Sequence, residues 1–491
     1  MKGKAKFLSH PVLNINEEKA AFLLTGLSIV VFCLISFLKN GTGDSGDSIS
    51  HFLIAKYSFK HPALFLNHWG KPLFTLLSSP FAQFGFTGIK VFNSLIASLT
   101  GYVTYKTARK LGMKNSLLVF VLLFFAPQYF VLIFSGLTEY LFAFALILSV
   151  YLIIDKKVMA SVILVSFLPF IRSEGLIIIG VFLIYMVIKG YFKILPLILT
   201  GHVIYGVAGL HHYGHFLWVF NAIPYMGTPD NYGSGHIFDF FSKLYYVIGF
   251  PLYVLLVIGL ITIIFTLFKR NRILNRKDFS AELILIVGSF LAFFMAHSIF
   301  WAFGLFHSFG LKRVLICTIP LISLMALRGL NIIALVRIKK VNLILPIFFT
   351  AYVMIFPFTG NPAAIKWNRE LDLSPDQKLI DQLSSYIRQT FPGYTLYYTH
   401  PYISLKLGID PYDKKEDGLI RNVLETKKAP AHSLIIWDSW FSVIEEKITL
   451  DYLLQNPNVS VLKTYDDAGP PAVRLVVLQI HPQTKDEKEI L

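Results

Sequence analysis

Long apolar stretches separated by short polar segments make up the first three quarters of the chain. A helix needs about 20 apolar residues to cross the hydrocarbon core of a bilayer. The pattern therefore predicts a mainly α-helical, polytopic membrane bundle of about eleven transmembrane helices. The predicted segments are 20–38, 88–110, 117–134, 138–154, 158–171, 174–188, 194–210, 245–268, 281–303, 311–327 and 341–358.

The stretch 158–188 is short for two full crossings. Its roughly 31 residues, at about 1.5 Å per residue, give a helix of only about 46 Å. We expect either two short helices or a re-entrant hairpin that starts on the cytoplasmic side. Both arrangements leave the predicted topology of the other segments unchanged.

Basic residues gather in short clusters between the apolar stretches, as they do in cytoplasmic loops of membrane proteins. With these clusters inside, the N-terminus is cytoplasmic, the loops at about 39–87 and 211–244 lie outside, and the tail is extracytoplasmic. We therefore predict a transmembrane module over 1–359 and a soluble extracytoplasmic domain over 360–491. The clusters lie at 2–6, 106–114, 156–157, 189–193, 269–277 and 337–340.

The tail after residue 360 differs from the bundle in its pattern. Segments 393–399, 433–438 and 473–479 alternate or run apolar like short strands. Segment 374–388 is amphipathic and begins with Ser-Pro, which is typical of a helix start. The tail is therefore predicted to be a small α/β domain.

Composition supports the membrane interpretation. Of the 491 residues, 55% are hydrophobic and 15% charged, whereas soluble domains carry about 25% charged residues. The net charge of +16 resides in the loop clusters, so it indicates topology and not nucleic-acid binding. Cys33 and Cys317 both lie inside apolar runs, so neither indicates a redox compartment.

The first predicted outer loop carries an acidic motif, Gly43-Asp44-Ser45-Gly46-Asp47. One interpretation is structural, with Asp44 or Asp47 capping a helix that starts near Ser48. The other is functional, because the segment 48–61 is basic and amphipathic and suits the membrane interface. A carboxylate beside such a helix, whose basic residues could meet lipid phosphates, is well placed to activate an acceptor for reaction with a membrane-bound phosphoester.

Four more outer segments carry candidate groups. His68 and Lys71 precede the helix-breaking Pro72, where they either anchor a loop or hold a phosphate. Glu139 begins a predicted helix as a cap or as a cavity-lining carboxylate, since an ionisable group so close to hydrocarbon is costly unless it is paired. Arg172 and Glu174 neutralise each other at a turn, or Arg172 binds phosphate while Glu174 holds it.

Arg313 is the last candidate, at the predicted outer end of a helix, where a basic residue departs from the positive-inside pattern. That departure favours a phosphate-binding role. No metal site is predicted, because His211 and His215 have helical spacing but no acidic partner nearby. No Gly-rich phosphate loop appears either.

In order and context these motifs resemble those of the GT-C superfamily of integral membrane glycosyltransferases. That superfamily includes protein O-mannosyltransferases, aminoarabinose transferases and many bacterial relatives. Two departures are visible: the aspartates are separated by Ser-Gly, and Val314 stands where relatives have tyrosine. The matching segments are the acidic motif at 43–47, Gly-Lys-Pro-Leu at 70–73, Thr-Glu at 138–139, Arg-Ser-Glu-Gly at 172–175 and Gly-Leu-Lys-Arg at 310–313 followed by Pro320.

The resemblance implies a bacterial inner-membrane hexosyltransferase that needs no cofactor, although dependence on a divalent metal stays open. Such an enzyme transfers a sugar from a polyprenyl-phosphate carrier to a glycan, lipid or protein acceptor on the outer face. The implied general base is Asp47, with Asp44 as the alternative. The implied phosphate-binding groups are Lys71, His68, Arg172 and Arg313, and the implied cavity-lining groups are Glu139 and Glu174.

Three other classes stay open at this point. A lipid or glycan transporter or flippase is disfavoured by the absence of an inverted sequence repeat. A glycan polymerase or ligase would need a large late outer loop, whereas here the acidic residues cluster in the first one. The third class is a non-catalytic membrane scaffold whose tail binds a partner; substitution of Asp47 would leave the assembly of a scaffold intact, whereas an enzyme would lose turnover.

Overall fold

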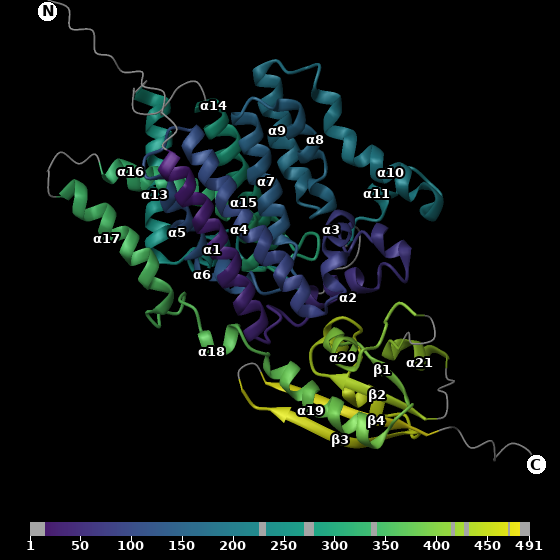
Figure 1. Ribbon diagram of the computed structural model, residues 1–491. Helices are drawn as coiled ribbons and strands as arrows, with labels where there is room; N and C mark the ends of the chain where they lie inside the picture. The colour runs from purple at the N-terminus through teal and green to yellow at the C-terminus, as the bar shows by residue number, and fades with distance from the viewer. Residues whose placement is uncertain are drawn as a thin grey trace, which may run out of the picture.

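The computed structural model describes residues 15–224, 232–269, 279–334, 341–413, 418–426, 432–469 and 472–481 (Figure 1). A helical bundle forms the larger part, and a small α/β domain at the C-terminal end lies against one side of it. The mainly helical architecture predicted from the sequence is confirmed. The basic clusters at 2–6 and 337–340 lie outside the described residues, as does the cluster at 269–277 apart from Lys269.

The helices of the bundle are α1 (Ile15–Leu38), α2 (Asp47–Tyr57), α3 (Pro72–Ala82), α4 (Phe86–Lys110), α5 (Val119–Phe124), α6 (Pro127–Leu132), α7 (Glu139–Ile154), α8 (Val158–Ser166), α9 (Gly175–Lys189), α10 (Thr200–Tyr213), α11 (Trp218–Asn221), α12 (Asp239–Ile248), α13 (Phe250–Lys269), α14 (Phe279–Ala281), α15 (Ser289–Ala302), α16 (Ile319–Ile333) and α17 (Val341–Ile355). Short 3-10 turns are η1 (Pro62–Leu66), η2 (Ser116–Leu118), η3 (Leu168–Phe170), η4 (Leu195–Leu199), η6 (Lys312–Thr318) and η7 (Phe356–Phe358), and η5 (Glu282–Gly288) is a π-helix.

Burial separates the central helices from those at the surface. Helix α7 is apolar all round and buried along most of its length, as expected of a helix surrounded by others. Helix α16 is likewise buried from Ile319 to Leu330. By contrast, α1 exposes large apolar side chains such as Phe22 and Phe37, which suits contact with lipid.

The described helices include three that are long and apolar enough to cross a membrane, or four if α12 and α13 form one broken span. Several other apolar helices are shorter, among them α7 and α9. The predicted number of about eleven crossings therefore stays a prediction. The stretch 158–188 does form two short helices, α8 and α9, joined by η3 and a turn.

Two predicted spans are not single helices. The segment 117–134 is divided into α5 and α6, because Pro127 lacks the N–H that would continue α5 and instead begins α6. The segment 245–268 is divided at Gly249, whose φ of 75° lies outside the helical region, and α12 and α13 meet there at 117°. The apolar pattern of the sequence continues through both breaks, because the residues on either side of each break are apolar.

The C-terminal domain contains α18 (Trp367–Glu370), α19 (Pro375–Thr390), α20 (Pro401–Leu407), α21 (Ile420–Thr426), α22 (Phe441–Ile444), α23 (Leu450–Leu454) and the strands β1 (Thr395–Tyr398), β2 (Ser433–Asp438), β3 (Val459–Asp467) and β4 (Val473–Ile480). The strand order is β1-β2-β4-β3, with β1 parallel to β2 and the other pairs antiparallel. The three predicted strands and the helix at 374–388 are confirmed, whereas β3 had not been predicted.

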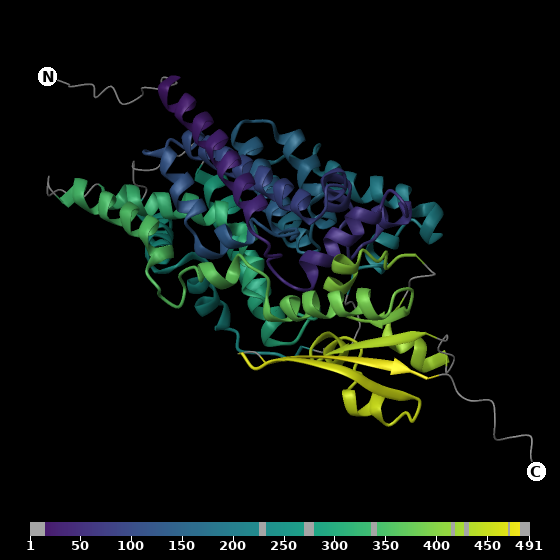
Figure 2. The same cartoon turned by 60° about the horizontal axis from the view of Figure 1, so that its bottom comes forward.

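Helix α19 lies between the sheet and the bundle (Figure 2). Its start is fixed by a capping box, in which Ser374 and Gln377 each bond to the other's backbone N–H. The Ser374 hydroxyl also lies 3.0 Å from the Ser45 hydroxyl in the first outer loop. The capped end of α19 therefore contacts the acidic motif directly.

The basic segment 48–61 does not behave as a free interfacial helix. Residues Ser48 to Ala55 of α2 are almost all buried inside the protein. Lys60 Nζ and His61 Nε2 lie 2.8 Å and 2.9 Å from an oxygen of Asp410 in the C-terminal domain. These two basic side chains therefore join the helical bundle to the C-terminal domain, and contact of the segment with lipid phosphates stays a prediction.

Candidate active site

The acidic motif folds into a tight turn at the start of α2. Gly43 has a φ of 82°, and a Cβ there would lie 2.5 Å from the Ser135 side chain, so only glycine fits. One Asp44 oxygen accepts hydrogen bonds from the N–H groups of Gly46 and Ser48, at 3.0 Å and 2.9 Å. Asp44 therefore caps α2, as one of the two interpretations of the motif predicted.

The Ser48 hydroxyl joins this turn to the start of α7. It donates to the Thr42 carbonyl at 2.5 Å and accepts from the Gly136 N–H at 2.6 Å. A Cβ on Gly136 would lie 2.3 Å from the Ser48 carbonyl oxygen, so the two backbones meet closely. This contact sets the distance between the acidic motif and Glu139.

We expect Gly136→Ala to lower the activity of the protein, because an added methyl group must push α2 away from α7. Overpacking of this kind costs about 1–3 kcal/mol, and a shift of about 1 Å in a reacting group can lower a rate about 100-fold. Gly180→Ala is the matched control, since a Cβ there meets no atom within 4 Å. Equal activity of the two variants, measured as turnover in lipid, would contradict this role of Gly136.

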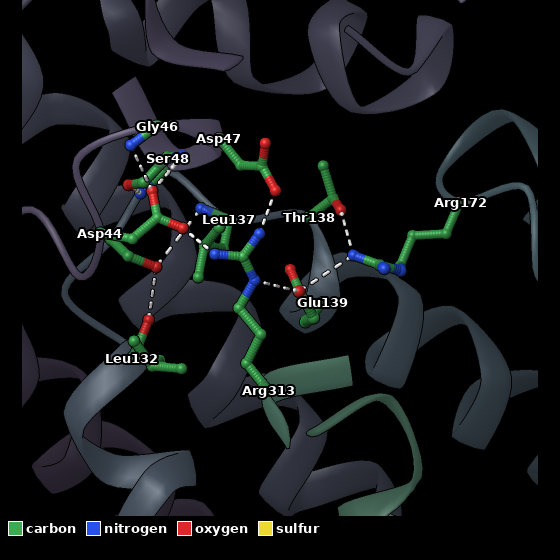
Figure 3. Close-up of polar contacts among 12 residues, drawn as sticks. Asp44, Gly46, Asp47, Ser48, Leu132, Leu137, Thr138, Glu139, Arg172 and Arg313 are labelled. Atoms are coloured by element: carbon green, nitrogen blue, oxygen red, sulfur yellow. Dashed lines mark hydrogen bonds and ion pairs between the residues drawn. The ribbon is translucent and has the colours of Figure 1, made fainter. Parts of the chain in front are cut away.

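Arg313 is the centre of the site, where it lies between three carboxylates (Figure 3). Its two terminal nitrogens donate to one oxygen of Asp44 and one oxygen of Asp47. Its Nε lies 3.4 Å from an oxygen of Glu139. Three residues before Arg313, Gly310 has a φ of 59°, a conformation that favours glycine at this turn.

A second guanidinium, that of Arg172, lies on the other side of Glu139. Arg172 donates to Thr138 Oγ1 at 3.2 Å and lies 3.0 Å from the same Glu139 oxygen that faces Arg313. Its other terminal nitrogen lies 2.7 Å from Glu174. Only 1% of the Glu139 side chain is exposed, so the two guanidiniums compensate a buried negative charge.

Lys71 completes the cationic side of the site. It has a φ of 63°, an unfavourable conformation for a residue with a Cβ, directly before Pro72 begins α3. Its Nζ donates to Ser173 Oγ at 3.0 Å, within the same turn that carries Arg172 and Glu174. Burial lowers the pKa of Lys71 to about 8, although the Glu174 carboxylate opposes that shift.

The two aspartates differ in what their oxygens do. Both Asp44 oxygens are engaged, one by backbone N–H groups and the other by Arg313. Asp47 uses one oxygen for Arg313, and its other oxygen accepts no hydrogen bond from the residues that the structure describes. With 41% of its side chain exposed, Asp47 is the more accessible carboxylate.

The structure brings six of the eight predicted site residues into contact in one cluster: Asp44, Asp47, Glu139, Arg172, Glu174 and Arg313. Lys71 joins it through Ser173. His68 does not, because its Nε2 is hydrogen-bonded to the Val219 carbonyl at 2.9 Å, next to Trp218. Burial lowers the pKa of His68 to about 4, so a phosphate-binding role as a cation is not supported.

Sequence reasoning missed His297 and the contribution of the C-terminal domain. His297 Nε2 lies 3.6 Å from Glu174 Oε1 and comes from α15. An ionisable residue within a predicted membrane helix is a functional candidate, so the signal was present. The hydrogen bond from Gln377 Nε2 to Thr42 Oγ1, at 2.7 Å, joins segments far apart in the chain, and no local pattern predicts it.

No group of three or more potential metal ligands occurs within the described ranges of the chain. Four carboxylates and three basic side chains instead surround the same small volume. An accessible carboxylate can take a proton from one reactant. The cationic side chains beside it can stabilise a phosphate on another reactant.

No protein-family model matches the chain, and no curated protein matches its sequence significantly. Its fold, however, matches solved structures of ArnT from Cupriavidus metallidurans. The structure bound to undecaprenyl phosphate gives a TM-score of 0.59 at 10% identity, covering 94% of this chain and 98% of ArnT. The apo structure gives 0.61 at 11% identity, covering 93% and 98%.

This match extends over both the helical bundle and the C-terminal domain, because it covers nearly all of each chain. At such low identity it is the fold that is shared. The chain therefore has the fold of the ArnT structures, in line with the fold that its resemblance to the GT-C superfamily implied.

Proposed function

We propose that the protein transfers a sugar from a polyprenyl-phosphate-linked donor to an acceptor on the outer face of the membrane, with Asp47 as general base. The observation that carries the proposal is the accessible Asp47 carboxylate beside two guanidiniums and a lysine. A structure of ArnT, which shares the fold, has undecaprenyl phosphate bound. The sugar and the acceptor are not assigned.

Asp47 is favoured over Asp44 as the base because of its free oxygen. A general base needs an unoccupied lone pair within hydrogen-bond reach of the proton that it accepts. Asp44 has both oxygens engaged, so its role is to cap α2 and orient Arg313. Although the Asp47 side chain is partly exposed, it is surrounded by protein on most sides, and the resulting desolvation raises the pKa of its carboxyl despite the nearby Arg172, which makes it a stronger base once ionised.

The donor phosphate would be bound by Arg172, Lys71 and Arg313. In the structure Arg313 is fully engaged by carboxylates. A phosphate must therefore either displace these carboxylates from Arg313 or bind first to Arg172 and Lys71. Glu139 and Glu174 hold the guanidinium of Arg172 in a fixed orientation. That preorganisation lowers the cost of stabilising the phosphate as it leaves.

In the proposed reaction the acceptor hydroxyl oxygen attacks the anomeric carbon of the donor sugar. Its proton passes to the free Asp47 oxygen while the bond from the anomeric carbon to the phosphate oxygen breaks. The electron pair of that bond leaves with the polyprenyl phosphate, where cationic side chains stabilise the charge. The configuration at the anomeric carbon is inverted.

Binding of undecaprenyl phosphate to the purified protein in detergent tests the proposed donor site. We expect Arg172→Gln to weaken binding by about 10- to 100-fold, since a charge-assisted hydrogen bond contributes about 1.5–3 kcal/mol. Arg109→Gln is the control, because Arg109 pairs with Glu17, outside this cluster. Equal affinity of the two variants would show that the phosphate binds elsewhere.

The pH dependence of this binding reports on Lys71. Its pKa of about 8 lies below the ordinary value of 10.5, and a bound phosphate would raise it again. Binding then takes up a proton above pH 8, so affinity falls as the pH rises, by roughly 20-fold from pH 7.5 to 9.5. Lys71→Arg should flatten this profile, and a flat wild-type profile would contradict a role for Lys71.

A further inference from the structure

A polar cavity of about 340 Å³ lies outside the candidate active site, between the bundle and the C-terminal domain. Its lining comes from the end of α1 and the start of α4 on one side, and from α19 and α20 on the other. The residues that matter for its chemistry are Asn40, Thr87, Lys90, Asp381, Tyr402 and Lys406.

Lys90 is the unusual member of this cavity. The residue is only 2% exposed, its Nζ lies 6.0 Å from the centre of the Phe86 ring, and no carboxylate in the described part of the chain lies within ion-pair distance of it. Its Nζ donates one hydrogen bond, to the Lys39 carbonyl at 2.5 Å, just past the end of α1. An ammonium has three hydrogens, so the cavity contains a buried positive charge with donor capacity to spare.

The other charges in the cavity cancel. The Asp381 carboxylate lies 2.8 Å from Lys406 Nζ and accepts a hydrogen bond from the Tyr402 hydroxyl at 3.1 Å. Lys90 therefore leaves the lining with one net positive charge. A buried charge without a counter-ion is costly, and an anion in the cavity would remove that cost.

The mouth of the cavity lies where lipid-facing surface meets polar surface. Leu38 is 76% exposed and stands two residues before Asn40, and Phe84 is 82% exposed and stands two residues before the lining residue Phe86. Exposed apolar side chains of this size at the ends of membrane helices are expected to contact acyl chains. A lipid beside them would have its headgroup at the level of Lys90.

We infer that this cavity binds the phosphate of an anionic membrane phospholipid, with Lys90 as its counter-ion and Thr87 and Asn40 as hydrogen-bond partners. This site is separate from the proposed donor site and does not depend on the proposed reaction. Thr42 also lines the cavity, and its hydroxyl donates to the Asp44 carbonyl and accepts from Gln377. A bound lipid would therefore stabilise the contact between the C-terminal domain and the acidic motif.

The test is native mass spectrometry of delipidated protein with short-chain phosphatidylglycerol, phosphatidylcholine or inorganic phosphate as probe. We expect phosphatidylglycerol to bind preferentially, and Lys90→Met to weaken that binding by about tenfold or more. Lys56→Met is the matched control, since Lys56 on α2 forms no ion pair among the described residues. Arg172→Gln should leave this lipid affinity unchanged, because Arg172 belongs to the donor site.

Two further variants keep the test decisive if Lys90→Met does not fold. Lys90→Arg should retain binding, and Thr87→Val should weaken it severalfold without removing a charge. The inference is overturned if Thr87→Val binds phosphatidylglycerol as well as the wild type does and Lys90→Met shows no loss of binding. It is also overturned if Thr87→Val binds as well as the wild type and the protein does not prefer phosphatidylglycerol to phosphatidylcholine. Inorganic phosphate that binds as tightly as phosphatidylglycerol would also overturn it, because the ligand would then be a free anion.

Discussion

Asp47→Asn is expected to lower turnover by about 10²- to 10⁴-fold while leaving the affinity for undecaprenyl phosphate nearly unchanged. The amide has the shape of the carboxylate but cannot accept a proton, and general-base catalysis contributes about this much to a rate. Asp47 has the free carboxylate oxygen that would accept the proton, so its substitution removes the general base. The measurement is sugar transfer in lipid, with carrier binding measured separately on the same preparation.

Asp44→Asn is the matched control for this substitution. Asp44 has both oxygens engaged, so its amide variant should lose a smaller part of the turnover and some stability at the start of α2. If instead Asp44→Asn abolished turnover and Asp47→Asn did not, the assignment of the base would be reversed. If neither mattered, the site itself would be wrong.

Arg313→Met is expected to have the largest effect on stability. Arg313 faces Asp44, Asp47 and Glu139, and its loss leaves three carboxylates with a single nearby guanidinium, that of Arg172. Breaking a buried ion pair by removing one partner costs about 3–5 kcal/mol. Denaturant titration in mixed micelles should show this loss, and turnover should disappear with it.

A double variant tests whether repulsion among the three carboxylates causes the stability loss of Arg313→Met. Adding Glu139→Gln should restore part of the stability, because it removes the most buried of the three negative charges. Lys312→Met controls for the loss of a positive charge at the same turn, since Lys312 contacts the Tyr246 ring and no member of the cluster. A double variant no more stable than Arg313→Met alone would contradict the account.

The apolar pattern predicted most of the helices and three of the four strands, because burial in lipid or in a sheet leaves a direct signal in the sequence. The helix at 374–388 was predicted from its Ser-Pro start, and the capping box explains why that signal was reliable. Strand β3 was missed because it is an edge strand whose residues are mostly exposed, with Lys463 and Asp466 among them. The helix break at Gly249 was missed because apolar residues continue through it.

The sequence predicted which residues belong to the candidate site better than it predicted which of them contact one another. Unusual charges at the ends of apolar segments marked Glu139, Arg172 and Arg313, since such charges are costly without a reason. That Arg313 would meet Asp44, 269 positions away in the chain, was not readable from local pattern. Nor could the sequence show that Lys60 and His61 pair with Asp410 in another domain.

The most direct test of the proposed function is release of polyprenyl phosphate by the purified protein in lipid nanodiscs. A panel of polyprenyl-phosphate sugars would be supplied with a membrane extract as the source of acceptor. The account predicts that one donor is consumed, that free polyprenyl phosphate appears in equal amount, and that Asp47→Asn stops both. Intact donors throughout the panel, with a protein that binds undecaprenyl phosphate normally, would contradict the account.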